Sequence, residues 1–419
     1  MRLLKLYSNE EKKERALLIE VDTGEYDAQA SLAELYELVI SAGAEPFGGM
    51  TQKRPTPDKA TCVGSGFIKE IAEFCNQQEI DLLVFDCELS PTQIRNIEDI
   101  CKVRLVDRTM LILDIFASRA KSREGKLQVE LAQLKYMLPR LTGRGVELSR
   151  LGGGIGTRGP GESKLETDKR HIRKRIEGLK EQLETVEKHR KQIDRRRKKD
   201  GVITVALVGY TNAGKSTLMN YLTNAGVLEK DMLFATLDPT ARALKLPGGT
   251  TVMLIDTVGL VRRLPHNLVQ AFHSTLEQAA GADIILNICD ASSPEADVHL
   301  KVTKDLLEEL GCKDTPIIPV LNKCDLLPKG QIIPFVGKSV RICAKTGAGV
   351  DKLLYAIERN LPNQMERLNL LLPFSKSSIA AQIRRDGRIE NEEYTERGLK
   401  LTAQIPLIMD DLIKDYIVE

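Results

Sequence analysis

Tryptophan is absent from this sequence, and phenylalanine and tyrosine together supply only 4% of its 419 residues. The hydrophobic cores must therefore consist mainly of leucine, isoleucine and valine, which the apolar content of 42% allows. A chain of this length is expected to form two to four domains.

Closely spaced cysteine pairs are also lacking. No C-x-x-C motif occurs, and no cysteine is combined with histidine in a metal-binding pattern. We therefore exclude a disulfide framework and a zinc site, and we expect reduced thiols in a cytoplasmic protein. The eight scattered cysteines are Cys62, Cys75, Cys87, Cys101, Cys289, Cys312, Cys324 and Cys343.

Long apolar runs are the third absence. The first fifteen residues are charged and contain no apolar core segment, so no signal peptide is expected. No run approaches the roughly 18 apolar residues of a membrane-spanning helix, so we expect no membrane partner. The formal net charge is only +2, but the charges are unevenly distributed along the chain.

One glycine-rich segment organises the sequence. Residues 209–216, G-Y-T-N-A-G-K-S, fit the phosphate-binding pattern G-x-x-x-x-G-K-[ST]. An apolar run at 202–208 precedes it and a helical pattern follows, which is the strand–loop–helix context that the motif needs. Lys215 would reach the β- and γ-phosphates, and the Ser216 hydroxyl would ligate magnesium. The predicted phosphate-binding residues are Gly209, Tyr210, Thr211, Asn212, Ala213, Gly214, Lys215, Ser216 and Thr217.

A second motif identifies the base of the nucleotide, because a phosphate loop alone does not distinguish a site for ATP from a site for GTP. Residues 322–325, Asn322, Lys323, Cys324 and Asp325, match N-K-x-D and follow a strand-like run at 317–321. The Asp325 carboxylate can accept hydrogen bonds from N1 and N2 of guanine, which adenine cannot donate. We expect Asn322 to contact the base and a nearby loop, and the Lys323 stem to pack on the ring.

A third segment, Cys343-Ala344-Lys345, is similar to the S-A-K element of guanine-nucleotide domains, with cysteine in place of serine. The backbone N–H of Ala344 is expected to contact the base there. Because a backbone group makes that contact, the exchange of serine for cysteine should be tolerated.

Two segments between these motifs have the spacing of nucleotide switches. Asp256-Thr257-Val258-Gly259 matches D-x-x-G, so Asp256 would hold magnesium through water and the Gly259 N–H would contact the γ-phosphate. The first switch is expected at 234–240. Thr236 is our choice for the second hydroxyl on magnesium, and Thr240 is the alternative. The expected nucleotide contacts in the first switch are Phe234, Ala235, Thr236, Leu237 and Asp238.

Three residues bear on mechanism. Leu260 occupies the position at which Ras-like switches carry a water-orienting glutamine, so we predict slow intrinsic hydrolysis and leave the catalytic residue unassigned. Asn212 is placed like the asparagine of potassium-stimulated GTPases, and a hydrogen bond within the loop is the alternative role. His266 is a candidate catalytic group, with a surface position at a helix start as the alternative.

The parts of the chain outside residues 200–362 carry no recognisable catalytic motif. Residues 1–121 alternate strand-like runs (16–21, 80–85 and 103–106) with helical patterns, which predicts a small parallel α/β domain. The stretch 47–65 is expected to be an exposed loop. Residues 363–419 should form a small α/β domain with strands near 368–372, 389–394 and 399–405.

Residues 122–199 are expected to form an antiparallel helical hairpin. Leucines recur at heptad spacing in 126–141, and a similar stripe runs through 163–199, so each helix can bury the other's stripe. Two helices that pack on separate domains are the alternative. The joining loop, 143–162, contains eight glycines together with Arg144, Arg150 and Arg158.

This loop and the helix after it indicate contact with RNA. Arginines on a glycine backbone can meet phosphates and stack on bases. Residues 163–199 hold fifteen Lys and Arg against seven Asp and Glu, and such a concentration of charge beside the loop favours nucleic acid over a merely solvated face.

Together these motifs resemble the HflX family of translation-associated GTPases related to Obg. The resemblance covers nearly the whole chain and is carried by residues 124–134, 149–162 and 234–240 with the D-T-V-G motif. It implies that the protein binds the large (50S) ribosomal subunit, with the hairpin loop near the RNA of the peptidyl-transferase region. It also implies a role in splitting stalled or idle ribosomes or in ribosome maturation. The residue at Leu260 is hydrophobic in this family too.

The predicted fold is α/β and multidomain, with a P-loop GTPase domain at 200–362 preceded by the α/β domain and the hairpin. The predicted activity is hydrolysis of GTP to GDP and phosphate with Mg²⁺, stimulated by the ribosome, in a monomer. Two alternatives remain: a signalling G protein whose hairpin binds a protein partner, and an ATP-driven RNA-remodelling factor.

Overall fold

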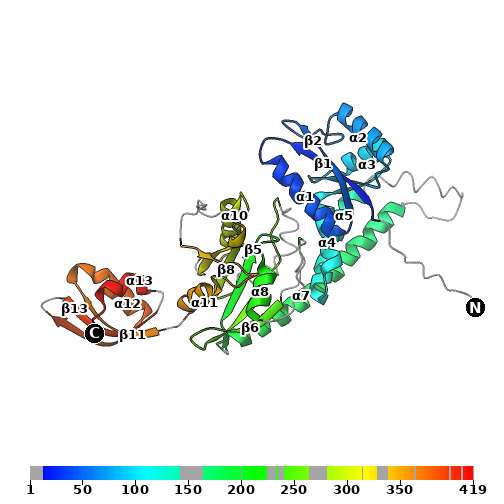
Figure 1. Cartoon of the computed structure of the whole chain (residues 1–419). Helices are drawn as coiled ribbons and strands as arrows, with labels where there is room; N and C mark the ends of the chain where they lie inside the picture. The colour runs from blue at the N-terminus through cyan, green and yellow to red at the C-terminus, as the bar shows by residue number, and fades with distance from the viewer. Residues whose placement is uncertain are drawn as a thin grey trace, which may run out of the picture. The chain divides into compact units, whose positions relative to one another are not determined.

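The computed structural model describes residues 13–141, 164–199, 201–223, 233–234, 240–263, 281–313, 315–327, 338–362, 365–395, 398–406 and 409–418. They fall into two compact units (Figure 1). The first contains the described residues up to Ile193 together with 233–234 and 259–263, and the second contains the rest. Two short pieces from the predicted GTPase region therefore group with the N-terminal part of the chain.

The first unit is built on a four-stranded parallel sheet of order β2-β1-β3-β4. The strand predictions near 16–21, 80–85 and 103–106 are confirmed. The loop predicted at 47–65 is wrong in part, because its first residues form β2, an edge strand whose Pro46 and two glycines hide a strand pattern. The strands are β1 (Arg15–Asp22), β2 (Glu45–Lys53), β3 (Leu82–Phe85) and β4 (Arg104–Asp107).

Helices connect these strands, and their ends follow local sequence signals. Asp27 caps the first helix by accepting from two backbone N–H groups, and Gly43 ends it with a φ of 94°. Ser90 and Gln93 form the capping box of the third. The helices are α1 (Ala28–Ala42), α2 (Ser65–Gln78), α3 (Pro91–Cys101) and α4 (Arg108–Arg119).

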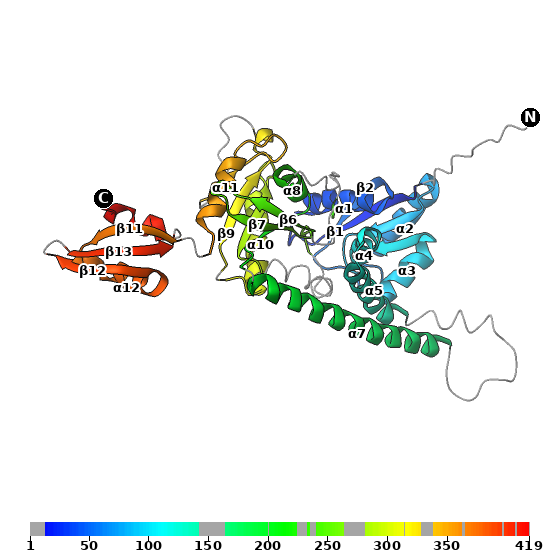
Figure 2. The ribbon, with the colours of Figure 1, turned by 90° about the horizontal axis from the view of Figure 1, so that it is seen from below.

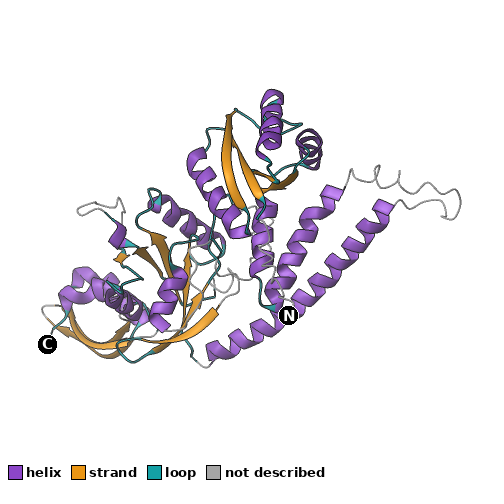
Figure 3. Cartoon of the chain, turned by 45° about the vertical axis from the view of Figure 1, so that its right-hand side comes forward, coloured by secondary structure: helices purple, strands orange, loops and turns teal. Residues whose placement is uncertain are grey.

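The helical hairpin consists of α5 (Arg123–Met137) and α7 (Lys164–Lys199), which lie side by side in Figure 3. Arg190 pairs with Glu124 at 2.9 Å and Arg175 pairs with Glu130 at 2.7 Å, so the two helices are antiparallel as predicted. The heptad seam is buried only in part, and α5 also packs on α4. The loop 143–162, with Arg144, Arg150 and Arg158, lies outside the described residues.

The second unit contains a six-stranded sheet of order β10-β9-β8-β5-β7-β6, parallel except for β6. Its strands are β5 (Thr204–Gly209), β6 (Thr240–Lys245), β7 (Thr251–Asp256), β8 (Ile284–Asp290), β9 (Ile317–Asn322) and β10 (Val340–Arg341). One face packs on α8 (Lys215–Thr223) and α11 (Val350–Arg359), and the other packs on α10 (Ala296–Glu309).

The C-terminal residues form an antiparallel sheet of order β11-β13-β12 with α12 against it (Figure 2). The strands predicted here are confirmed. The elements are β11 (Met365–Leu372), α12 (Ser377–Asp386), β12 (Arg388–Thr395), β13 (Gly398–Pro406) and α13 (Asp410–Ile413). Within the described part of the chain, every helix is too short or too polar to span a bilayer.

Candidate nucleotide-binding site

The carboxyl edge of the six-stranded sheet brings the sequence motifs together. The phosphate loop follows β5, Asp256 ends β7, Asp290 ends β8 and Asn322 ends β9. Parallel strands that start from one side of a sheet must finish at the same edge. In such sheets ligands bind beyond the carboxyl ends where the strand order reverses, which here is beside β5.

The phosphate loop needs its glycines for two physical reasons. Gly209, Asn212 and Gly214 have φ values of 152°, 58° and 87°, which let successive N–H groups face inward. A Cβ atom on Gly209 would lie 2.0 Å from the carbonyl oxygen of Ile288, and one on Gly214 would lie 2.2 Å from Asn322 Nδ2. Side chains at these two positions would therefore push the loop away from the sheet.

Lys215 is a buried cation at the centre of this loop. Its Nζ donates to the carbonyl oxygens of Gly209 at 3.0 Å and Tyr210 at 2.7 Å. Burial lowers the pKa of Lys215 to about 8, although Asp256 acts in the opposite direction. An anion placed in the loop would relieve this desolvation, as expected for a phosphate-binding lysine.

The residues expected to hold magnesium converge. Ser216 Oγ donates to Asp256 Oδ2 at 3.0 Å, so a hydroxyl and a carboxylate from α8 and β7 face each other. Hard oxygen donors of this kind are the ligands that Mg²⁺ prefers, and the donor set therefore fits the ion. Thr240 begins β6 directly opposite Asp256, whereas Thr236 lies outside the described residues.

Asn322 joins the phosphate loop to the base-binding segment. Its side chain is 2% exposed, its Nδ2 donates to the Ala213 carbonyl at 2.9 Å, and its Oδ1 accepts from the Ala344 N–H at 2.9 Å. The expected contact with a nearby loop is present. Both ends of the amide, and the Ala344 N–H that we expected on the base, are engaged within the protein here.

Asp325, the predicted guanine-reading carboxylate, is exposed, and its environment favours its charge. A hydrogen bond from the Cys343 thiol, with smaller contributions from Lys345 and Lys323, lowers the pKa of Asp325. The cysteine that replaces serine in the S-A-K-like element thus supports the carboxylate through its side chain.

Sequence reasoning missed two residues that shape the site. Asp290 pairs with Lys323 Nζ at 2.8 Å and so fixes the lysine whose stem was expected to flank the base. His299 of α10 stacks on Tyr210 with ring centroids 3.9 Å apart, which braces the start of the phosphate loop. The polar end of β8 could have indicated Asp290, but no local signal indicated His299.

The remaining predicted nucleotide contacts stay predictions. The Thr257 hydroxyl donates to the Leu207 carbonyl of β5 at 2.6 Å, so it supports the sheet. Phe234, Gly259 and Leu260 belong to the first compact unit. The predicted residues Ala235, Thr236, Leu237 and Asp238, together with the candidate His266, lie outside the described residues.

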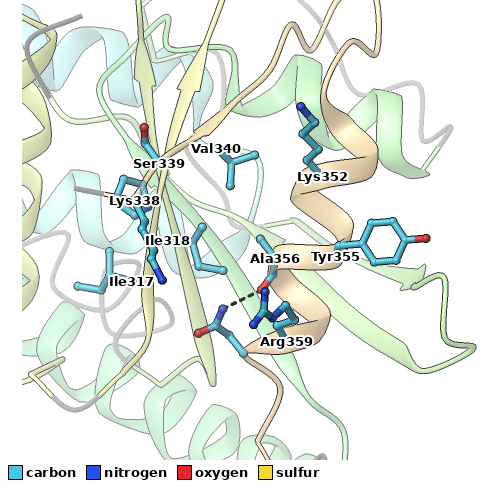
Figure 4. A pocket seen from close by; sticks show the side chains of 11 residues that line it. Ile317, Ile318, Lys338, Ser339, Val340, Lys352, Tyr355, Ala356 and Arg359 are labelled. Atoms are coloured by element: carbon cyan, nitrogen blue, oxygen red, sulfur yellow. Dashed lines mark hydrogen bonds between the residues drawn. The ribbon is translucent and has the colours of Figure 1, made fainter. Parts of the chain in front are cut away.

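A separate pocket of about 500 Å³ lies at the opposite edge of the sheet, between the starts of β9 and β10 and helix α11 (Figure 4). Lys338, Lys352 and Arg359 line it, and Asn360 closes the helix by donating to the Ala356 carbonyl at 2.8 Å. None of these residues belongs to the nucleotide motifs, so the pocket is distinct from the carboxyl-edge site.

Family models match three consecutive parts of the chain. The GTP-binding GTPase N-terminal model matches residues 29–117, the middle-region model matches 119–197 and the 50S ribosome-binding GTPase model matches 204–323. GTPase HflX of Caldanaerobacter subterraneus is 49% identical over 407 residues, covering 97% of this chain and 94% of the relative. This chain belongs to the HflX GTPase family.

Other HflX proteins agree with this assignment. GTPase HflX of Lacrimispora saccharolytica is 48% identical and covers 96% of each chain, and GTPase HflX of Escherichia coli is 40% identical and covers 94% of each. The predicted family, the α/β fold with a P-loop GTPase domain and the hydrolysis of GTP are thereby confirmed.

Proposed function

We propose that this HflX GTPase binds Mg²⁺ and GTP at the carboxyl edge of the six-stranded sheet, docks on the large ribosomal subunit and uses hydrolysis as a switch. Its cellular task would be ribosome splitting and recycling, rescue or biogenesis. The main supporting observation is that one sheet edge holds both the phosphate loop and the start of the guanine-reading motif. The 50S ribosome-binding GTPase model matches residues 204–323, which include this edge.

The chain's own groups perform three tasks in this proposal. Lys215 and the loop N–H groups stabilise the charge of the β- and γ-phosphates. Ser216 and Asp256 would hold Mg²⁺, which would neutralise charge on the transferred phosphoryl group. Asp325 and its support from Cys343 select guanine. Leu260 has no polar group with which to orient water, so intrinsic turnover should be slow and the subunit should stimulate it.

The proposed RNA contact uses the hairpin. Helix α7 presents exposed cations along much of its length, and two of them, Arg175 and Arg173, pair with Glu130 and Glu166 of the hairpin. Neutralisation of RNA phosphates by such a helix releases counterions, so the affinity should fall steeply with salt. The exposed cations include Arg170, Arg173, Lys174, Arg175, Lys180, Lys188, Arg195 and Arg196.

Co-sedimentation on sucrose gradients tests the docking. The chain is mixed with purified large subunits in GDP or a non-hydrolysable GTP analogue, at two salt concentrations. We expect it to migrate with the large subunit in the GTP-analogue state and to dissociate as salt rises. Migration with neither subunit in either nucleotide would contradict the proposal and favour a protein partner for the hairpin.

Deletion of residues 143–161 tests the loop. The deletion should reduce subunit-stimulated hydrolysis at least about tenfold while GTP binding stays within about twofold, because the phosphate site is left intact. A matched control replaces the same residues by a glycine–serine linker of equal length, which keeps the hairpin connected but removes the arginines. Full stimulation by either variant would refute the role of the loop.

The role of a monovalent cation is proposed separately. Asn212 Oδ1 accepts from Lys323 Nζ at 3.5 Å, so a potassium ion at this amide oxygen would take the place of the ammonium group. Turnover should be several-fold faster in potassium than in sodium at equal ionic strength, and Asn212→Ala should remove the difference. Equal rates in the two salts would leave Asn212 with a loop hydrogen bond only.

A further inference from the structure

The four-stranded sheet of the first unit also has a carboxyl edge at which its strand order reverses. The order β2-β1-β3-β4 places that reversal between β1 and β3. Glu20 near the end of β1 and Asp86 directly after β3 lie there, and both are buried. Sheets of this type bind ligands at such points, so two buried carboxyl groups there need a physical explanation.

Asp86 is the centre of the cluster. One of its oxygens accepts from Arg108 at 2.5 Å, and the other accepts from the Ser31 hydroxyl at 2.6 Å and from Arg263. The Asp86 side chain is only 1% exposed. Glu20 adds no full charge at neutral pH, because burial and the neighbouring Asp86 raise its pKa to about 9, although the hydrogen bond that Tyr26 donates to it at 2.8 Å acts in the opposite direction.

Arg263 enters this cluster from a distant part of the sequence. Its guanidinium contacts Asp86 and the Ser31 hydroxyl and lies over the Tyr26 ring at 4.0 Å from the centroid. A carboxylate, a hydroxyl and an aromatic face are the three kinds of group that recognise a planar guanidinium. Arg263 lies four residues after Gly259, the last residue of D-x-x-G.

The neighbouring residue is held as well. Arg262 Nε lies 3.6 Å from Glu34 Oε2, and the Arg262 carbonyl accepts from Arg108 at 3.0 Å. Arg108 also pairs with Glu34 and is 3% exposed. Helices α1 and α4 therefore bind the backbone and both side chains of the segment that continues the D-x-x-G motif.

A second contact of the same kind involves the region before D-x-x-G. The Leu233 N–H donates to the Ser41 hydroxyl of α1 at 3.0 Å, and the Phe234 ring packs edge-on against Phe116 of α4 at 4.5 Å between centroids. Phe234 is where the first switch was expected to begin. Helix α4 thus contacts Phe234 of the predicted first switch as well as the segment after D-x-x-G, and α1 contacts the adjacent Leu233.

We propose that Ser31 and Asp86, with the Tyr26 ring, form a guanidinium-binding site on the N-terminal sheet whose ligand is Arg263, and that its occupancy is linked to the bound nucleotide. The linkage follows from covalent geometry. Gly259 is expected to contact the γ-phosphate, and the four peptide bonds from Gly259 to Arg263 are too few for the two ends to move independently. Any nucleotide that shifts Gly259 therefore changes how well Arg263 fits its site.

Charge balance supports this assignment. The buried Asp86 and the partly buried Glu34 are two carboxylates that share one buried partner, Arg108. Arg262 and Arg263 bring the two further positive charges to this acidic pair. Departure of the segment would leave excess negative charge in a site of low exposure, so a guanidinium from another molecule should be able to take its place.

Chemical rescue tests the site directly. Arg263→Ala removes the ligand, and ethylguanidine at millimolar concentration is then added to the full-length protein. The Tm of the variant should rise by about 2–4 °C with ethylguanidine. The wild-type protein should not respond, and neither should Arg242→Ala, a matched loss of an exposed arginine on β6. An equal change in Tm for all three proteins would refute the proposed site.

A second variant, within the guanidinium-binding site itself, distinguishes specific binding of ethylguanidine from unspecific stabilisation. Ser31→Ala in the Arg263→Ala background removes the hydroxyl that faces the guanidinium, and it should weaken ethylguanidine binding several-fold. Unchanged affinity would also overturn the site. Arg263→Gln serves as the second starting variant if the alanine protein does not fold, and GDP binding reports that the fold is intact.

Reciprocity tests the linkage to nucleotide. If occupancy of the site by Arg263 is linked to the nucleotide, Arg263→Ala must change the ratio of the GDP and GTP-analogue affinities relative to the wild-type protein. We expect a factor of at least about five, and a factor of one would refute the linkage. Ethylguanidine is not tethered to Gly259, so it should leave the ratio of the variant unchanged. None of these measurements uses ribosomes, so failure here is distinguishable from failure of the proposed function.

Discussion

In the six-stranded sheet the carboxyl ends of the strands lead to Lys215, Asp256 and Asn322, whereas in the four-stranded sheet they lead to Glu20, Asp86 and Asp107. Both edges hold buried polar groups at a reversal of strand order. The first edge keeps its lysine on backbone carbonyls and its serine on an aspartate, which are contacts that a phosphate and a magnesium ion can replace. The second edge pairs the Asp86 carboxylate with Arg108 and Arg263 of the same chain.

This difference shows that the carboxyl edge of a parallel sheet can bind either an external ligand or a segment of its own chain. A site made for a ligand tolerates a buried charge with weak partners, because the ligand later compensates for its desolvation. A site that binds a segment of its own chain satisfies its charges at once. Asp107 shows the second pattern too, since it accepts from the Tyr136 hydroxyl, from the Leu89 N–H at 3.1 Å and from the Met110 N–H at 2.9 Å.

Among the variants that test this difference between the two edges, we expect the largest loss of nucleotide affinity at Lys215. Lys215→Met should weaken GTP and GDP binding by roughly 100-fold or more, the scale of a lost buried charge contact. Asp86→Asn at the other edge should instead lower Tm while GDP binding is retained. Titration with a fluorescent nucleotide and thermal unfolding, applied to both variants, distinguish the two edges. Comparable loss of nucleotide binding in both would show that the edges are not functionally different.

Asn322 offers the next largest effect. Asn322→Ala leaves the Ala213 carbonyl and the Ala344 N–H without their buried partner and should cost about 2–4 kcal/mol of stability in the second unit. Asn360→Ala is the matched control, because its amide makes a single, half-buried contact at a helix end and should cost under about 1 kcal/mol. Denaturant unfolding, monitored by hydrogen exchange in β5 and β9, measures the loss of stability in both variants. Similar costs would mean that Asn322 is not the structural link.

The pH dependence of stability should have opposite signs at the two edges. The folded pKa of Glu20 is raised from 4.5 to about 9, so its contribution is fully present below pH 4.5 and is lost as pH rises toward 9. The folded pKa of Lys215 is lowered from 10.5 to about 8, so its penalty is relieved as pH rises from 8 to 10.5. Each slope is at most about 1.4 kcal/mol per pH unit.

Two variants isolate these slopes. Glu20→Gln should flatten the fall in stability between pH 6 and 8.5, and Lys215→Met should flatten the rise above pH 8, when each is compared with the wild-type protein in nucleotide-free denaturant unfolding. Parallel pH profiles of the variant and the parent would show that the residue concerned keeps its ordinary titration in the folded protein.

The smallest effect, a modest loss of GTP affinity, is expected at Cys343, beside the predicted guanine contact. Cys343→Ala removes the thiol that supports Asp325 and should weaken GTP binding about three- to fivefold, since one hydrogen bond to a charged, exposed group is lost. Cys343→Ser should restore most of the affinity because its hydroxyl can donate in the same way. Equal affinities of the alanine and serine variants would assign base recognition to backbone groups alone.

Much of the nucleotide site could be predicted because its motifs are local. The loop 209–216 needs glycine at two positions for steric reasons, and N-K-x-D needs an aspartate for guanine, so both are visible in a single sequence. The side-chain role of Cys343 was not predicted, because it depends on where a later loop returns to the sheet. The contact between Cys62 and Cys87, whose sulfurs lie 3.2 Å apart, was missed for the same reason.

The sequence by itself determined the family, the GTPase motifs, most strands and helices, and the antiparallel hairpin, because periodicity, capping and motif spacing act over a few residues. Only the tertiary structure decided that Asn322 joins two loops, that Asp290 and His299 brace the site, and that Arg262 and Arg263 bind the N-terminal sheet. These facts depend on which strands are neighbours and on which segments return to them. No pattern in the sequence specifies which buried carboxylate lies beside an arginine 177 positions away.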